Sequence, residues 1–120
     1  MAKFLIHVTT GPEDPTKAAL AFLVAATAAK EGHVVNLFIA GDGVSLLNPE
    51  VIPYIEGKGT GLLQSHLEAI ASNGARLYLS GMSAKARGLD ESILSGLPAE
   101  FAMPDVLVRL AAEADTVLCY

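Results

Sequence analysis

The sequence predicts an α/β protein in which helices cover both faces of a parallel sheet. Short apolar segments alternate along the chain with longer segments of helical periodicity, which is typical of parallel strands joined by right-handed crossovers. The first short segment, Phe4-Leu5-Ile6-His7-Val8, is almost wholly apolar, as expected for a strand covered on both faces. The chain has 120 residues, so we expect one domain, residues 1–120.

The first helix is predicted to follow the strand at 4–8. Asp14 can accept hydrogen bonds from free backbone amides at the start of a helix. Pro15 suits the first helical position, because its missing N–H would have no partner there. We expect this helix to run to about Glu31 and to end at Gly32.

The second strand is predicted at 34–39 and ends at the turn Gly41-Asp42-Gly43. From 43 to 61 the chain contains several prolines and glycines and is predicted to be irregular, with one helical turn at 44–47. The segment 62–72 has apolar residues on one face and is predicted as the second helix.

The second half of the chain continues the alternation with shorter elements. We expect, in order, a strand at 76–79, short helices at 82–87 and 90–95, a strand at 99–103, a helix at 104–113 and a strand at 116–120. Asp90 can cap the second short helix, and Pro104 can open the longer one. Five strands are therefore predicted.

Composition excludes several classes of protein. Hydrophobic residues make up 52% of the chain and charged residues 18%, which excludes disorder. The net charge of −5 argues against nucleic-acid binding, which needs a basic surface. Neither a signal peptide nor a membrane-spanning stretch is recognisable, so we expect a soluble cytoplasmic protein with no membrane partner.

The sequence also limits which metal sites and thiol reactions are possible. One cysteine, Cys119, excludes an intrachain disulfide and a cysteine-rich zinc site. The histidines, His7, His33 and His66, are scattered, so we predict no metal site and no cofactor. His7 lies in an apolar strand and is predicted to be a hydrogen-bonded core residue, and His66 is predicted to be solvated.

The first helix predicts assembly. From Ala18 to Ala29 it is apolar at almost every position, and a helix that is apolar all round is usually buried all round. A domain of this size can hardly bury a whole helix alone. We therefore expect a homo-oligomer with this helix at the subunit interface, and the alternative is a small alanine-rich face left exposed.

The candidate site is predicted at the ends of the strands. In parallel sheets, ligands bind outside the carboxyl ends of the strands. The segment Ser80–Gly88 has two hydroxyls at the end of a strand, with Lys85 and Arg87 following them, and a helix start there favours an anion. The alternative is an ordinary turn with a serine cap and solvated basic residues.

Two other features have structural and functional interpretations. Cys119 lies in an apolar strand, so we expect a buried, slowly reacting thiol, unless the strand end is accessible. Gly57-Lys58-Gly59-Thr60-Gly61 lacks the spacing of a phosphate-binding loop, and we interpret it as a flexible loop, with closure over a ligand as the alternative.

Several motifs in order resemble the DsrE/DsrF-like family, which includes YchN-like proteins. They are Thr9-Thr10-Gly11-Pro12-Glu13-Asp14, the apolar first helix, Gly41-Asp42-Gly43-Val44 and Ala84-Lys85-Ala86-Arg87-Gly88. The resemblance implies a three-layer α/β/α sandwich with a five-stranded parallel sheet, and homo-oligomers such as trimers or hexamers. It also implies sulfur-relay chemistry, in which some members carry a persulfide on a cysteine at the end of the third strand.

That cysteine position matches Ser80 here, and a second cysteine position of some relatives matches Ser83. A hydroxyl cannot hold a persulfide. We therefore expect a small molecule or a partner protein to be bound without thiol catalysis at Ser80, in a pocket of Thr10, Asp14, Ser80, Ser83 and Arg87. The alternatives are a sulfurtransferase that uses Cys119 and an accessory oligomer with a purely structural role.

Overall fold

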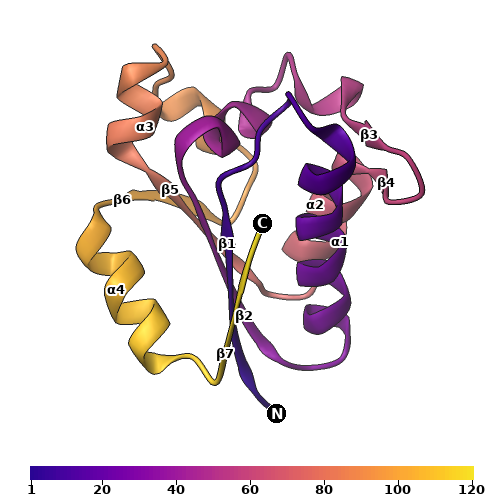
Figure 1. Cartoon of the computed structure of the whole chain (residues 1–120), viewed down its shortest axis with the longest axis vertical. Coiled ribbons are helices and arrows are strands. Elements are labelled where there is room, and N and C mark those ends of the chain that lie inside the picture. Colours follow the sequence, from indigo (N-terminus) through magenta and orange to yellow (C-terminus); the bar gives the residue numbers. More distant parts are fainter.

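The computed structural model describes residues 1–120 and confirms the predicted fold class. All pairings in the main sheet are parallel, and the strand order is β6-β5-β2-β1-β7 (Figure 1). The strands are β1 (Lys3–Val8), β2 (Val34–Ile39), β5 (Arg76–Ser80), β6 (Ala99–Ala102) and β7 (Thr116–Cys119). The last strand therefore returns to lie beside the first.

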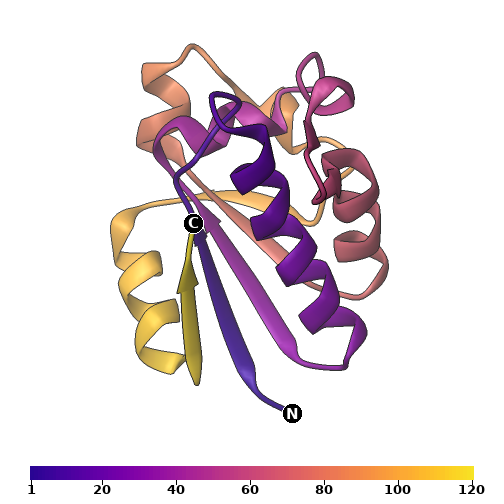
Figure 2. The ribbon, with the colours of Figure 1, turned by 45° about the vertical axis from the view of Figure 1, so that its right-hand side comes forward.

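The direction of each crossover determines which face a helix covers. The chain moves one way along the sheet through α1 (Pro15–Lys30) and α2 (Leu63–Ser72), so right-handed crossovers place both helices on one face. It returns the other way through α4 (Pro104–Glu113), which lies on the opposite face (Figures 1 and 2). The short helix α3 (Gly81–Ala86) stands at the carboxyl edge of the sheet.

The connection predicted to be irregular is largely ordered into short elements. It contains the 3₁₀ helices η1 (Gly41–Leu47) and η2 (Ile52–Tyr54) and a small hairpin of β3 (Glu56–Gly57) and β4 (Gly61–Leu62). A third 3₁₀ helix, η3 (Glu91–Leu94), replaces the second short helix expected near Asp90. Prolines and glycines in this connection thus shorten the elements without removing them.

The hydrophobic core lies mainly under α1 and α2. On that face, 23 buried residues form one cluster, whereas only Leu5, Phe38 and Leu110 form the buried cluster under α4. Alanines make up most of the inner side of α1, and their small side chains allow this helix to lie close to the sheet around the fully buried Phe22.

The single chain buries part of the surface of α1. The sheet, α2 and the β3–β4 hairpin cover its inner side and flanks, but Leu20, Leu23 and Val24 are only partly buried and Thr27 is exposed. The single chain therefore buries more of this helix than the sequence pattern suggested. What stays open is one outward strip.

The glycine-rich segment predicted as a flexible loop is held against the start of α1. The amide of Lys58 donates a hydrogen bond to Thr16 Oγ1 (3.0 Å), and Thr60 Oγ1 donates one to the Thr16 carbonyl (2.9 Å). His66, expected to be solvated, is half-buried, with Nε2 2.7 Å from the carbonyl oxygen of Thr60. These contacts fix the hairpin on the helix.

None of the helices is both long enough and apolar enough to cross a membrane.

Candidate functional site

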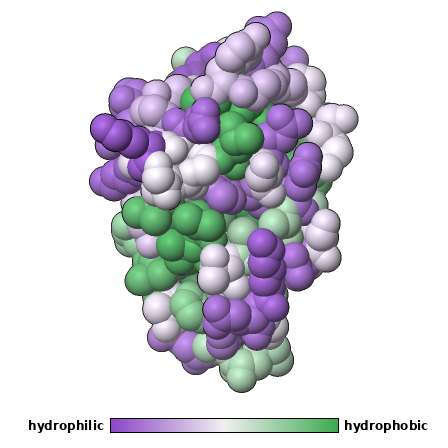
Figure 3. Space-filling view, turned by 90° about the vertical axis from the view of Figure 1, so that its right-hand side faces the viewer, coloured by the Kyte–Doolittle hydropathy of each residue, from purple (hydrophilic) through white to green (hydrophobic).

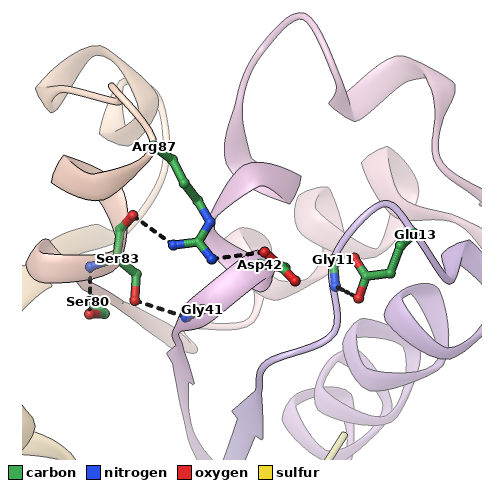
Figure 4. Close-up of polar contacts among 7 residues, drawn as sticks. All are labelled: Gly11, Glu13, Gly41, Asp42, Ser80, Ser83 and Arg87. Carbon is green, nitrogen blue, oxygen red and sulfur yellow. Dashed lines mark hydrogen bonds and ion pairs between the residues drawn. The ribbon is translucent and has the colours of Figure 1, made fainter.

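Segments from three neighbouring strands meet at the carboxyl edge of the sheet. They are the loop after β1, the start of η1 after β2, and α3 after β5 (Figure 4). Parallel strands bring such segments together, because all their carboxyl ends lie at one edge. We call the polar contacts of Gly41, Asp42, Ser80, Ser83 and Arg87 the edge network.

Two serine hydroxyls hold the backbone of the edge network in place. Ser80 ends β5 and caps α3, and its Oγ accepts a hydrogen bond from the amide of Ser83 (3.1 Å). Ser83 Oγ in turn accepts one from the amide of Gly41 (2.9 Å). Ser80 is only 8% exposed, so its hydroxyl lies beneath the surface of the edge.

Arg87 joins α3 to η1. Its Nη1 donates to the carbonyl oxygen of Ser83 (3.1 Å), and its Nη2 forms an ion pair with Asp42 Oδ1 (2.8 Å). The side chains of Arg87 and Asp42 are 32% and 63% exposed, so the pair is at the surface. The sequence predicted that the positive charge of Arg87 would favour a bound anion. In the structure, the carboxylate of Asp42 balances this charge.

The loop after β1 contacts the edge network through its backbone. A Cβ at Gly11 would overlap the carbonyl group of Asp42, and a Cβ at Gly43 would lie 2.8 Å from the carbonyl oxygen of Val8. The amide of Gly11 donates to Glu13 Oε2 (3.0 Å). Glycine is thus required where these two loops approach each other.

The five predicted ligand-binding residues divide into two groups. Ser80, Ser83 and Arg87 lie together in the edge network. Thr10 is half-buried in the adjoining loop, whereas Asp14 uses its side chain to cap α1, accepting from the amide of Lys17 (3.1 Å). Sequence reasoning left out Asp42, although the Gly41-Asp42-Gly43 turn was already identified as a strand end.

A hollow of about 330 Å³ lies beside the edge network. Gly88, Leu89 and Asp90, which follow Arg87, line one side, and Asn48 and Glu50 line another. Two carboxylates and the absence of a lysine or arginine make this hollow acidic. The only cation that adjoins it in sequence is Arg87, which already pairs with Asp42.

Cys119 is exposed, which contradicts the expectation of a buried thiol. The reason is the place of β7 at the edge of the sheet, where α4 does not cover the strand completely. Cys119 pairs in register with His7 of β1, so the two side chains lie on the same face of the sheet. Three strand spacings, about 14 Å, separate β7 from β5, so this thiol is distant from Ser80.

His7 is not the hydrogen-bonded core residue that the sequence predicted. Its Nε2 is buried and has no hydrogen-bond partner, and its ring lies edge-on to Phe38 with centroids 6.0 Å apart. Burial lowers the pKa of His7 from 6.5, because an apolar environment disfavours the charged imidazolium. The ring next to Cys119 is therefore neutral at neutral pH.

Comparison of the sequence with known proteins gives matches along its full length. The model of the DsrE/DsrF-like family matches residues 2–120. An uncharacterised protein of Methanocaldococcus jannaschii is 32% identical over 98% of this chain and 99% of its own. An uncharacterised protein of Methanopyrus kandleri is 33% identical over 96% of this chain and 91% of its own.

Solved structures show the same fold at lower identity. The YchN protein of E. coli superposes with a TM-score of 0.81 at 20% identity, covering 100% of both chains. A conserved protein of unknown function from Bacteroides thetaiotaomicron has a TM-score of 0.72 at 15% identity, covering 99% of this chain and 95% of its own. A protein of unknown function from Methanobacterium thermoautotrophicum has a TM-score of 0.69 at 14% identity, covering 100% of both chains.

Proposed function

Because the chain belongs to the DsrE/DsrF-like family, some members of which are sulfur-relay proteins, we propose that it binds a small anionic ligand of a sulfur-related pathway at the edge network. It does so without carrying sulfur on Ser80. The observation that carries this proposal is the ion pair of Arg87 with Asp42 at the carboxyl edge of the sheet. It supplies a fixed guanidinium, at the surface, where ligands of parallel sheets bind.

The geometry of Ser80 argues against a covalent role for its hydroxyl. Its Oγ caps α3 and is almost wholly buried, and an alcohol oxygen cannot hold a persulfide. A ligand anion would instead compete with the Asp42 carboxylate for Arg87, because a guanidinium binds either group through the same N–H donors. Asp42 then acts as a stand-in for the ligand in the free protein.

Anion binding tests the proposal. We expect thiosulfate or sulfite to raise the melting temperature of the wild-type protein, because a ligand that binds only the native state stabilises it. Arg87→Gln should abolish the rise, and Asp42→Asn should enlarge it by freeing the guanidinium. Arg76→Gln is the matched control, since Arg76 forms a comparable exposed pair with Glu100 at the other end of β5.

Two outcomes would overturn the proposal. One is a melting temperature that neither anion changes, and the other is a rise that Arg87→Gln leaves intact. In the second case the anions bind elsewhere on the chain. The same result for Arg76→Gln and Arg87→Gln would indicate a general effect of positive charge.

A second candidate function uses Cys119 as a sulfur carrier, and the exposure of its thiol favours it. The Cys119 thiolate would attack a terminal sulfane sulfur of a polysulfide, forming a persulfide and releasing a polysulfide shorter by one sulfur. The test is mass spectrometry after polysulfide treatment, with Cys119→Ala as the control. A mass gain of one sulfur atom on the wild type alone supports this function, and no gain excludes it.

A double variant tests whether the end of β5 is accessible to a sulfur donor. In a Cys119→Ala background, Ser80→Cys introduces a thiol at the end of β5. Because Ser80 is buried and caps α3, we expect this thiol to accept sulfur more slowly than Cys119 does in the wild type. Faster loading of the thiol introduced by Ser80→Cys would show that the edge network opens readily, contrary to the structure.

We also propose that the working form is a homo-oligomer in the cytoplasm, a trimer or a hexamer. The open strip on α1 supports self-association, because partly exposed leucine and valine side chains remain on a helix that is otherwise buried. The anion experiment above distinguishes ligand binding from a purely structural role. A scaffold that binds no ligand would show no change in melting temperature when thiosulfate or sulfite is added.

A further inference from the structure

The outward side of α1 has the residue spacing of a helix-pairing seam. Lys17, Leu20, Val24, Thr27 and Glu31 follow one another at intervals of three, four, three and four residues. This spacing places them in one stripe along the helix, as in coiled coils. All five are exposed or only partly buried, and we call them the α1 stripe. Figure 3 views the side of the molecule that carries α1 and α2 and shows hydrophobic residues exposed at mid-height, bordered by hydrophilic ones.

The two charged ends of the α1 stripe have no ionic partner within the chain. The three ion pairs of the molecule join Arg76 to Glu100, Arg87 to Asp42 and Arg109 to Glu113. Lys17 and Glu31 take part in none of them. Each lies seven residues from Val24, on opposite sides, which is about 10.5 Å along the helix axis. The stripe therefore has a positive end, an apolar middle and a negative end.

We propose that a second copy of this chain packs its α1 antiparallel against this one, with a two-fold axis passing near Val24. Such an axis relates each residue to the one equally far on the other side of Val24, so Lys17 meets the partner's Glu31 and Glu31 meets the partner's Lys17. The charge pattern is complementary to itself only in this antiparallel arrangement. A parallel pair would place like charges together. This inference rests on the proposed self-association and locates its contact.

A hollow that shares Val24, Thr27 and Glu31 with the stripe extends this contact to neighbouring residues. This open hollow of about 380 Å³ lies along the second half of α1 and is lined by Phe4, Leu23, Val24 and Ala28 among others. Its apolar lining would be covered together with the stripe. One helix surface alone is small compared with the roughly 800 Å² that each partner buries in a stable interface, so an adjoining apolar surface is needed.

The contact also distinguishes between the two proposed assemblies. A ring of three subunits has only a three-fold axis and contains no two-fold contact. A hexamer made of two such rings contains two-fold axes, and a dimer contains one. If α1 pairs as proposed, the assembly has an even number of subunits.

Charge reversal tests this geometry. Lys17→Glu or Glu31→Lys alone should place like charges in contact twice per interface and raise the dissociation constant of the pair by about tenfold. The double variant Lys17→Glu with Glu31→Lys should restore assembly to the wild-type level. Lys30→Glu is the matched control for the first variant, because Lys30 points about 100° away from Glu31 around the helix. Sedimentation equilibrium at several protein concentrations gives each constant.

Both single variants are compatible with the fold. Glutamate in the first turn of a helix and lysine at its end each interact favourably with the helix dipole, so neither change weakens α1 itself. A loss of assembly can therefore be attributed to the interface. Circular dichroism and melting at high dilution check that each variant is folded.

A cross-link gives an independent measurement. In a Cys119→Ser background, Val24→Cys places two thiols beside the two-fold axis, and mild oxidation should convert most of the protein to a disulfide-linked dimer. Lys30→Cys should cross-link far less. If the wild type is a monomer, both the self-association and this contact are wrong. If it assembles but no charge reversal weakens it and the Val24→Cys variant does not cross-link, only this contact is wrong.

Discussion

His7 combines a buried ring nitrogen that has no partner with a pKa held below 6.5. Between that lowered pKa and 6.5, the unfolded chain binds more protons at this position than the folded chain. The free energy of unfolding should therefore fall as the pH decreases below 6.5 and should stop falling once the folded protein also protonates.

The His7 prediction is tested by urea unfolding at about pH 7.5 and about pH 5.5, the range over which an ordinary histidine titrates. The wild type should lose more stability over this range than His7→Gln, which cannot titrate. His66→Gln serves as the control for removing a histidine elsewhere. Equal losses for the wild type and His7→Gln would show that burial of this ring does not govern the acid sensitivity.

Ser83 accepts the hydrogen bond that fixes the start of η1, so removing its hydroxyl leaves the Gly41 amide without a partner. Ser83→Ala should lower the free energy of unfolding by about 1 kcal/mol. Ser65→Ala, on the exposed side of α2, should have no such effect, because alanine is at least as favourable in a helix. Equal unfolding midpoints for the two variants would contradict the role assigned to Ser83.

At the scale of elements, the two sides of α1 should respond very differently to truncation. Phe22 is fully buried among the alanines, so Phe22→Ala should cost about 3–5 kcal/mol by leaving a cavity. Val24 is only partly buried, at the margin of the core, and Val24→Ala should cost less, about 1 kcal/mol, in the dilute monomer. Denaturant unfolding at low protein concentration measures both, and similar costs would mean that α1 is oriented differently. Phe22 is consequently unsuitable for testing an interface.

The approach of η1 to β1 depends on the absence of a side chain at Gly43. A methyl group there would lie 2.8 Å from the Val8 carbonyl oxygen and 3.1 Å from Ile39 Cγ2, so Gly43→Ala should destabilise the fold by about 1–3 kcal/mol. Gly81→Ala is the matched control, because the nearest atom to its added methyl, Phe101 Cβ, is 3.8 Å away. Equal unfolding free energies for these two variants would show that the loop adjusts freely.

The strands were the elements that the sequence predicted best, because each is a short apolar run that ends at turn residues. The predicted strand at 76–79 differs from β5 by one residue, and that at 99–103 from β6 by one. The edge network was harder to predict, since Asp42 and Arg87 are 45 residues apart and no local pattern links them. Cys119 was misjudged because an apolar run does not reveal that its strand lies at the edge of the sheet.

For the whole molecule, assembly should make thermal stability depend on concentration. If folded chains associate, mass action favours the folded state more at higher protein concentration. The melting temperature of the wild type should rise over a hundredfold increase in concentration, and that of Lys17→Glu should rise less. Scanning calorimetry measures both. A melting temperature that is independent of concentration would contradict self-association.

The return of β7 to the side of β1 also determines the order in which the protein can be completed during synthesis. The amide of Lys3 donates to Asp115 Oδ2, a contact between residues 112 positions apart, and β7 is the last strand to be made. Until β7 emerges from the ribosome, β1 has one edge unpaired. The nascent chain therefore exposes an unpaired strand edge that is open to pairing with other chains.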